Sequence, residues 1–155
     1  IPVDEETNLI TWKEEITEKG NKDQLYVRAK EWRNANYKNS QEVTRIRDKE
    51  NGRIVINHRI RMNDIDANGN SVASNTIVNY ILRLEFRENR FRYTFTEFTM
   101  RATSKYPLER WLNKTDPTYL PQYEKYLDQV AEEIEKLIES LVEGMKPKVV
   151  KEDVW

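Results

Sequence analysis

Hydrophobic and polar residues alternate along several stretches of the chain, and each stretch predicts a β-strand with one buried face. Residues 9–16 place Ile10, Trp12 and Ile16 on one side, with polar residues between them. The same alternation predicts further strands over 43–48, 53–62, 75–87 and 90–100. The pattern therefore predicts an isolated first strand and a run of four later strands.

One segment between the first two strands has the period of a helix. Asn21 and Gln24 have the spacing of a helix-capping pair, in which each side chain bonds to the other residue's backbone. Leu25, Ala29 and Trp32 then fall on one side of a helix that we expect to end around residues 34–36.

A second, longer helix is predicted near the C-terminus. Thr118 is its expected cap, Pro121 is expected in its first turn, and Gly144 and Pro147 are expected to end it. Its apolar stripe is broad and needs a sheet or a second copy of the chain to cover it. The stripe contains Tyr123, Leu127, Val130, Ala131, Ile134, Leu137, Ile138, Leu141, Val142 and Met145.

Turn residues predict how the four later strands pair. A three-residue loop at 50–52, with Gly52 in the left-handed conformation, pairs Ile46 with Ile56. This register keeps Arg47 away from the buried side, where an unpaired charge is costly. A second hairpin around 88–89 pairs apolar residues on one face and polar residues on the other.

These elements predict an α+β fold built on a single antiparallel sheet. The order is strand, helix, four strands and helix, with both helices on one face of the sheet. We expect residues 1–100 to form the core and 101–117 to be irregular, with one helical turn at 107–112. Residues 118–145 form the long helix on the same domain, and 146–155 form a tail that is disordered or needs another strand's edge.

Several segments resemble a bacterial family of unknown function described as having a TATA-binding-protein-like fold. They are Pro2-Val3-Asp4, Thr7, Ile10, Trp12, Leu25-Tyr26, Arg28-Ala29-Lys30-Glu31-Trp32, Tyr37-Lys38-Asn39-Ser40, the segment 48–52 and Arg92-Tyr93-Thr94-Phe95-Thr96. The resemblance covers roughly residues 2–100, and the sequence departs from the family's pattern after Ile54. It implies the same strand order and no catalytic residue.

The resemblance also implies a location. Members of the family look like exported proteins of Gram-negative gut bacteria, and this chain begins at Ile1 without a methionine. We therefore expect a periplasmic or extracellular protein whose signal peptide has been removed.

Composition excludes several kinds of chemistry. The 155 residues include 26 Lys and Arg against 27 Asp and Glu, for a net charge of −1, so there is no global attraction to nucleic acid. The chain has no cysteine, which excludes disulfides and thiolate catalysis. His58 is the only histidine, so a site with several histidine ligands is excluded, and a histidine at the edge of the core is the expected role.

A short acidic segment resembles the first half of a calcium-binding loop. Asp64, Asp66, Asn68 and Asn70 alternate along the chain, with Gly69 between the last two. Asn75 stands where such a loop needs a closing glutamate. The alternative interpretation is a polar turn between two strands, because Asp, Asn and Gly favour turns for conformational reasons. Calcium is the only cofactor that the sequence suggests.

The predicted registers place six arginines on the outer face of the sheet, opposite the helices. Guanidinium groups suit carboxylates, phosphates and sulfated glycans, so this face is a candidate for binding anions or a partner, with a solvated face as the alternative. Nucleic acid is disfavoured because Phe91, Tyr93 and Phe95 point inward and leave no stacking platform. The six are Arg45, Arg47, Arg59, Arg61, Arg83 and Arg92.

The sequence favours a noncatalytic binding or assembly module over an enzyme. We expect a protein partner or self-association, because no catalytic motif is present and the long helix and tail carry unpaired apolar residues. The alternatives are a glycan-processing hydrolase that uses two carboxylates, and a calcium-stabilised or anion-binding module for glycan or nucleic acid. The sequence indicates no small-molecule ligand.

Overall fold

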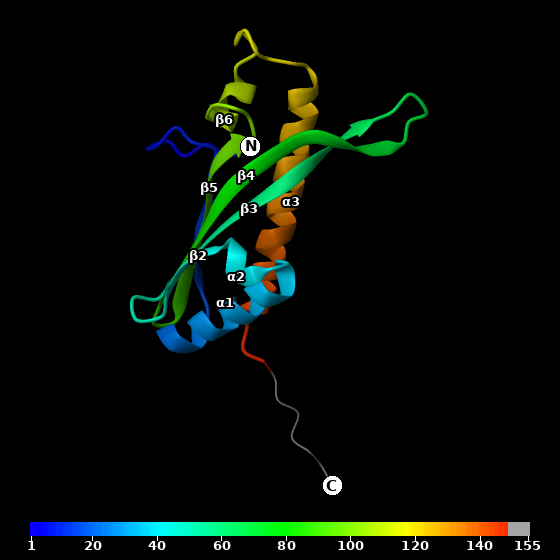
Figure 1. The fold of residues 1–155 in the computed structure, drawn as a ribbon. Coiled ribbons are helices and arrows are strands. Elements are labelled where there is room, and N and C mark those ends of the chain that lie inside the picture. Colours follow the sequence, from blue (N-terminus) through cyan, green and yellow to red (C-terminus); the bar gives the residue numbers. More distant parts are fainter. Residues whose placement is uncertain (149–155) are drawn as a thin grey trace.

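The structure, a computed structural model, describes residues 1–148 and contains one antiparallel sheet with helices on one face (Figure 1). The strands lie in the order β1-β5-β4-β3-β2, and β6 pairs with β5 beyond the end of β1. The strands are β1 Trp12–Thr17, β2 Thr44–Asp48, β3 Arg53–Ile65, β4 Ser71–Arg87, β5 Arg90–Met100 and β6 Tyr106–Pro107. The helices are α1 Lys22–Asn36, α2 Ser40–Val43, the 3₁₀ helix η1 Leu108–Leu112 and α3 Gln122–Gly144. The predicted fold class is confirmed, and β6 and α2 are additions to it.

Helix α1 begins and ends as the sequence predicts. Asn21 accepts a hydrogen bond from the backbone N–H of Gln24, and the Gln24 side chain accepts one from the backbone N–H of Asn21. This reciprocal cap satisfies two N–H groups that the first turn leaves without partners. Leu25, Ala29 and Trp32 are buried against the sheet.

Helix α3 begins later than predicted, and the expected cap is wrong. Pro121 is the residue before the first turn, and Thr118 caps nothing. The Asp116 carboxylate instead accepts hydrogen bonds from the backbone N–H and the hydroxyl of Thr118. These bonds hold Thr118 in the preceding loop, so the chain turns into the helix only at Gln122.

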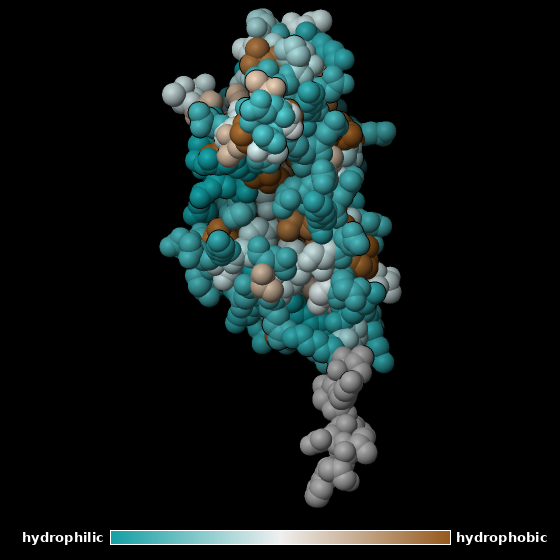
Figure 2. Space-filling model, turned by 90° about the vertical axis from the view of Figure 1, so that its right-hand side faces the viewer, coloured by the Kyte–Doolittle hydropathy of each residue, from teal (hydrophilic) through white to brown (hydrophobic). Residues whose placement is uncertain are grey.

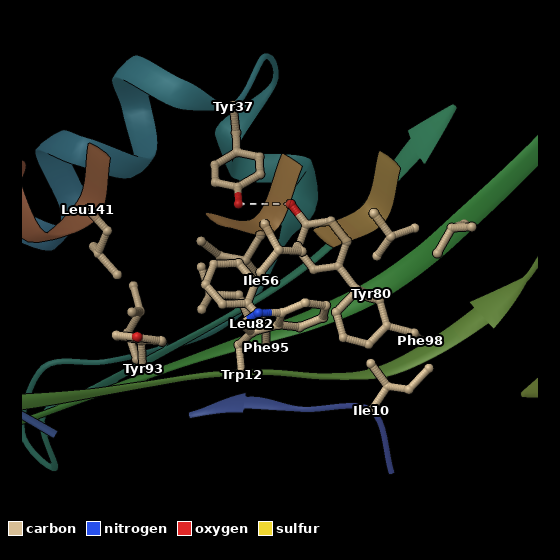
Figure 3. Close-up of a cluster of buried hydrophobic side chains, with 14 of the residues drawn as sticks. Ile10, Trp12, Tyr37, Ile56, Tyr80, Leu82, Tyr93, Phe95, Phe98 and Leu141 are labelled. Atoms are coloured by element: carbon tan, nitrogen blue, oxygen red, sulfur yellow. Dashed lines mark hydrogen bonds between the residues drawn. The ribbon is translucent and has the colours of Figure 1, made fainter. Parts of the chain in front are cut away.

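The core is one continuous cluster between the inner face of the sheet and helices α1 and α3 (Figure 3). Trp12, Leu82 and Phe95 come from three neighbouring strands, and Leu141 comes from α3. Most of the broad apolar stripe on α3 is buried or half-buried within the chain itself. The segment 146–155, predicted as a tail, lies outside the described residues from 149 onward.

The predicted register of β2 against β3 is wrong by one residue. A four-residue loop, 49–52, joins the strands in place of the predicted three-residue loop, so that Ile46 lies opposite Val55 and Arg47 opposite Ile54. A bulge at Arg45 shifts only the pair beyond it, Thr44 with Ile56. Ile46 therefore faces outward, and Arg47 turns to the helical side. Arg47 avoids burial because β2 is an edge strand, and its guanidinium donates a hydrogen bond to the backbone carbonyl of Gln41.

The β4–β5 hairpin has the predicted register. Phe86 pairs with Phe91, Leu84 with Tyr93, and Glu85 lies opposite Arg92 on the outer face. Strands β3 and β4 run further than predicted and form a long arm that projects from the body of the molecule (Figure 1).

A depression on the outer face as the candidate site

A depression of about 920 Å³ lies on the outer face of β3, β4 and β5. Its floor includes Asn57 from β3, Asn79 and Ile81 from β4, and Thr99 from β5. The segment around α2 forms one rim, and the chain that follows β5 forms the other. We call this hollow the outer-face depression.

Six cationic side chains line the outer-face depression. They are Lys38, Arg45, Arg59, Arg61, Arg101 and Lys105. Only two acidic side chains line it, Glu42 and Glu97. The chain as a whole is almost neutral, so this hollow concentrates positive charge that the net charge conceals.

Strand geometry explains why the arginines of β3 reach this face. Successive side chains of a strand point to opposite faces, so Asn57, Arg59 and Arg61 share the outer face, while Ile56 and Ile60 face the helices. Ile56 is fully buried and Arg59 is exposed, as this alternation requires.

Within residues 1–148, none of the six cations forms an ion pair. The depression's acid Glu97 is already engaged by Arg83, at 3.2 Å. Glu97 occupies a β-bulge with a φ of 54°, which directs it across to that arginine. The cationic groups of the hollow are therefore available to a ligand.

The structure divides the six predicted arginines into three groups. Arg45, Arg59 and Arg61 line the depression. Arg83 and Arg92 lie on the outer face but are paired with acids; the Arg92 guanidinium makes two hydrogen bonds to Glu85 and lowers the pKa of that carboxyl. Arg47 is on the other side of the sheet, because the four-residue loop shifts β2 by one residue against β3.

Sequence reasoning missed half of the depression's cations. Lys38, Arg101 and Lys105 come from irregular segments at the two rims, where no periodicity indicates the direction of a side chain. Arg101 directly follows β5 and Lys105 directly precedes β6, and neither strand carries any of the other three cations.

Neutral aromatic and imidazole groups lie directly beneath the arginines of β3. The Tyr37 hydroxyl is 3.0 Å from the Tyr80 hydroxyl (Figure 3), and the His58 ring packs edge-on against Tyr37. Burial raises the pKa of both tyrosines. Burial and the nearby charge of Arg59 lower the pKa of His58. The layer under the depression is therefore uncharged at neutral pH.

A second, smaller hollow of about 290 Å³ lies on the inner side of β3. It shares Arg59 and Arg61 with the outer-face depression, so the two hollows meet at the edge of β3. Leu137 and Glu133 of α3 line its far side.

The segment with the calcium-like pattern forms the tip of the β3–β4 arm. Asp66 accepts hydrogen bonds from the backbone N–H groups of Asn68 and Asn70, and Asp64 accepts one from the Tyr126 hydroxyl. In the described part of the chain, no group of three His, Cys, Asp or Glu side chains is arranged to hold a metal ion. The carboxylates have structural partners, which favours the turn interpretation.

A family model described as "Domain of unknown function (DUF4468) with TBP-like fold" matches residues 12–101, which span β1 to β5. The chain belongs to this family. The resemblance inferred from the sequence is therefore confirmed. The DUF4468 match includes the floor of the depression and leaves η1 and α3 outside.

Two solved structures share the fold over nearly the whole chain. A DUF4468 family protein from Bacteroides ovatus ATCC 8483 has a TM-score of 0.72 and 15% identity, covering 96% of this chain and 93% of that one. A TBP-like protein from Parabacteroides distasonis ATCC 8503 has a TM-score of 0.71 and 12% identity, covering 93% and 96%. At these identities the likeness establishes the fold alone. No curated protein sequence matches the chain significantly.

Helix hydropathy and one face of the surface complete the description of the molecule. Among residues 1–148, no helix is long and apolar enough to cross a bilayer. Figure 2 shows the side toward which the β3–β4 arm projects, and its surface is mostly hydrophilic, with separate hydrophobic spots.

Proposed function

We propose that this DUF4468 protein is a noncatalytic binding module that holds an acidic segment of a protein partner in its outer-face depression. The observation that carries the proposal is the presence, in one hollow of about 920 Å³, of six cations that form no ion pair with any residue from 1 to 148. Like charges grouped in this way repel one another, and carboxylates from a ligand would relieve that repulsion.

The chemistry of the cations supports a carboxylate ligand. Arginine presents a planar fork of N–H donors that matches a carboxylate with two parallel hydrogen bonds. Arg45, Arg59, Arg61 and Arg101 supply four such forks around one floor. A concave surface lined by one sign of charge also concentrates field lines and speeds the encounter with an oppositely charged partner.

Binding fits the depression better than carboxylate catalysis. A glycosidase needs two carboxyl groups that converge on one bond. Here Glu42 comes from α2 at one rim, and Glu97, on the far side of β3 and β4, is engaged by Arg83. A protein ligand is also favoured over nucleic acid, because Phe91, Tyr93 and Phe95 are buried on the inner face.

The test is fluorescence anisotropy with a labelled nine-residue peptide of alternating glutamate and valine. The double variant Arg59→Glu/Arg61→Glu is expected to weaken binding about tenfold or more, since two favourable charge pairs become repulsive. The matched control Arg87→Glu/Lys125→Glu changes the net charge equally at exposed sites outside the depression, and should bind like the unmodified protein.

Equal weakening by the two double variants would show that only net charge matters, and would refute the proposal. Tighter binding of a single-stranded oligonucleotide or of heparin than of the peptide, with the same dependence on Arg59 and Arg61, would move the function to another class of polyanion.

A further inference from the structure

We infer that the acidic partner segment binds as an additional β-strand along the free edge of β3 at residues 57–61. This inference rests on the proposed function and specifies how the ligand is held. Adding a strand to an exposed sheet edge is an established way for one protein to bind an extended segment of another.

The edge of β3 is free over this stretch. On the side away from β4, β2 pairs with β3 only from Arg53 to Ile56. Further along, the Gln129 side chain of α3 pairs with the backbone of Asn63, accepting from its N–H at 2.8 Å and donating to its carbonyl at 2.9 Å. Between these two partners, no described backbone group pairs with the outward edge of β3, and the His58 imidazole lies beside the Arg59 backbone.

Three hydrogen bonds determine which backbone groups point outward. The Gly52 carbonyl accepts from the Phe86 N–H of β4, and the backbone groups of Asn63 point to Gln129 on the opposite side. Backbone groups alternate in direction along a strand, so even-numbered residues of β3 face β4 and odd-numbered ones face outward. The N–H and carbonyl groups of Asn57, Arg59 and Arg61 are thus presented at the free edge.

The hollows on the two sides of this edge match the side chains of an added strand. Alternate side chains of a strand point to opposite faces. On one side they would enter the outer-face depression with its cations. On the other they would enter the hollow of about 290 Å³, where Leu137, Ile60 and Tyr37 offer apolar contacts and Glu133 disfavours a second acidic side chain. The geometry therefore selects a segment that alternates acidic and apolar residues, over about five residues or roughly 17 Å.

Charge argues that the occupant is a different protein and not a second copy of this chain. Two copies paired through this edge would bring Arg59 and Arg61 of one molecule close to the same arginines of the other. Like charges that face one another across paired strands destabilise the pairing. An acidic segment gains from the same arrangement.

The experiment compares three versions of the glutamate–valine peptide: unmodified, N-methylated on the glutamate nitrogens, and N-methylated on the valine nitrogens. In an antiparallel added strand, the glutamate N–H groups face β3 and the valine N–H groups face away. Methylating the glutamates should weaken binding at least about tenfold through lost hydrogen bonds and steric clash, while methylating the valines should change it less than about threefold. The reverse result indicates a parallel strand and also supports the inference.

Equal effects of the two methylated peptides, whether both bind or neither does, would overturn the added strand. If the two methylated peptides behave alike but binding of the unmodified peptide still depends on Arg59 and Arg61, the proposed function stands and only the added strand is refuted. If the unmodified peptide binds the Arg59→Glu/Arg61→Glu variant as well as it binds the unmodified protein, the proposed function itself fails.

Discussion

The hydrogen bond between Tyr37 and Tyr80 is expected to couple the two residues energetically. Tyr37 is 4% exposed and Tyr80 2%, and each hydroxyl has the other as its hydrogen-bond partner among the described residues. Changing either residue alone to phenylalanine removes the bond and leaves the other hydroxyl buried without a partner. Changing both removes both polar groups and keeps the rings that fill the core.

The magnitude follows from burial. A buried hydroxyl left unsatisfied costs about 1–3 kcal/mol, so Tyr37→Phe and Tyr80→Phe are each expected to destabilise the protein by that amount. Replacing both partners by apolar groups of the same shape is close to neutral. The double variant should therefore be less destabilised than the sum of the single variants by at least about 1 kcal/mol.

Urea denaturation of the four proteins measures these differences, provided that the slope of unfolding free energy against urea stays constant. Each kcal/mol should also move the melting temperature by about 2–4 °C in a domain of this size. Tyr93→Phe is the matched control, because its hydroxyl bonds to Glu14 at a partly exposed site where water can replace it. It should cost less than about 1 kcal/mol.

Additive effects would refute the reasoning. If the double variant lost as much stability as the two single variants together, the hydroxyls would not depend on each other. Single variants as stable as the unmodified protein would show that water or another group satisfies the remaining hydroxyl.

Three further predictions concern other parts of the chain. Gly52→Ala should lower the free energy of unfolding, measured by urea denaturation, by about 2 kcal/mol or more, because the φ of Gly52 is +66° and an added Cβ would lie 2.6 Å from the Phe86 carbonyl oxygen. Gly69→Ala should lower it clearly less, because Gly69 has a φ of +79° but no neighbour within 4 Å of an added Cβ. The pKa of His58, read by NMR, should lie below its ordinary value of about 6.5. The imidazole of His58 then binds a proton more readily in the unfolded chain than in the folded protein, so the free energy of unfolding should fall as the pH drops through about 6.5 toward the folded pKa. His58→Gln should reduce this dependence on pH. An unchanged slope of unfolding free energy against pH in the variant would contradict the prediction. Titration with calcium should give no heat in calorimetry and no change in melting temperature, because the Asp66 carboxylate already accepts hydrogen bonds from two backbone N–H groups. A measurable affinity for calcium would contradict this prediction.

The fold was predictable wherever local pattern and tertiary packing agree. The β4–β5 hairpin could be aligned because a register slip would expose every apolar side chain of one face. The register of β2 was not predictable, since an edge strand with few apolar residues tolerates a one-residue shift that leaves Arg47 on the helical side at an exposed position. Arg33 shows a different limit: it lies four residues after Ala29 on the buried side of α1, but its charge predicts exposure. It is 1% exposed, with the Thr44 hydroxyl and Asn34 as partners.

The candidate site was predictable only in part, for a related reason. Arg59 and Arg61 follow from strand alternation, and both line the depression. The free edge between Ile56 and Asn63 depends on where β2 ends and on which residue of β3 the Gln129 side chain of α3 contacts. Both depend on long-range packing. The sequence therefore indicated a positively charged face of the sheet. The structure shows in addition that this face is hollowed and lies beside the free edge of β3.

The most direct test of the account is NMR mapping of backbone amides as the unmodified glutamate–valine peptide is added to isotopically labelled protein. We expect the largest shifts at residues 57–61 of β3, with smaller ones at 77–81 and 97–101 around the depression. Largest shifts on α3 or at the tip of the β3–β4 arm, or no shifts at peptide concentrations that saturate the anisotropy signal, would contradict it.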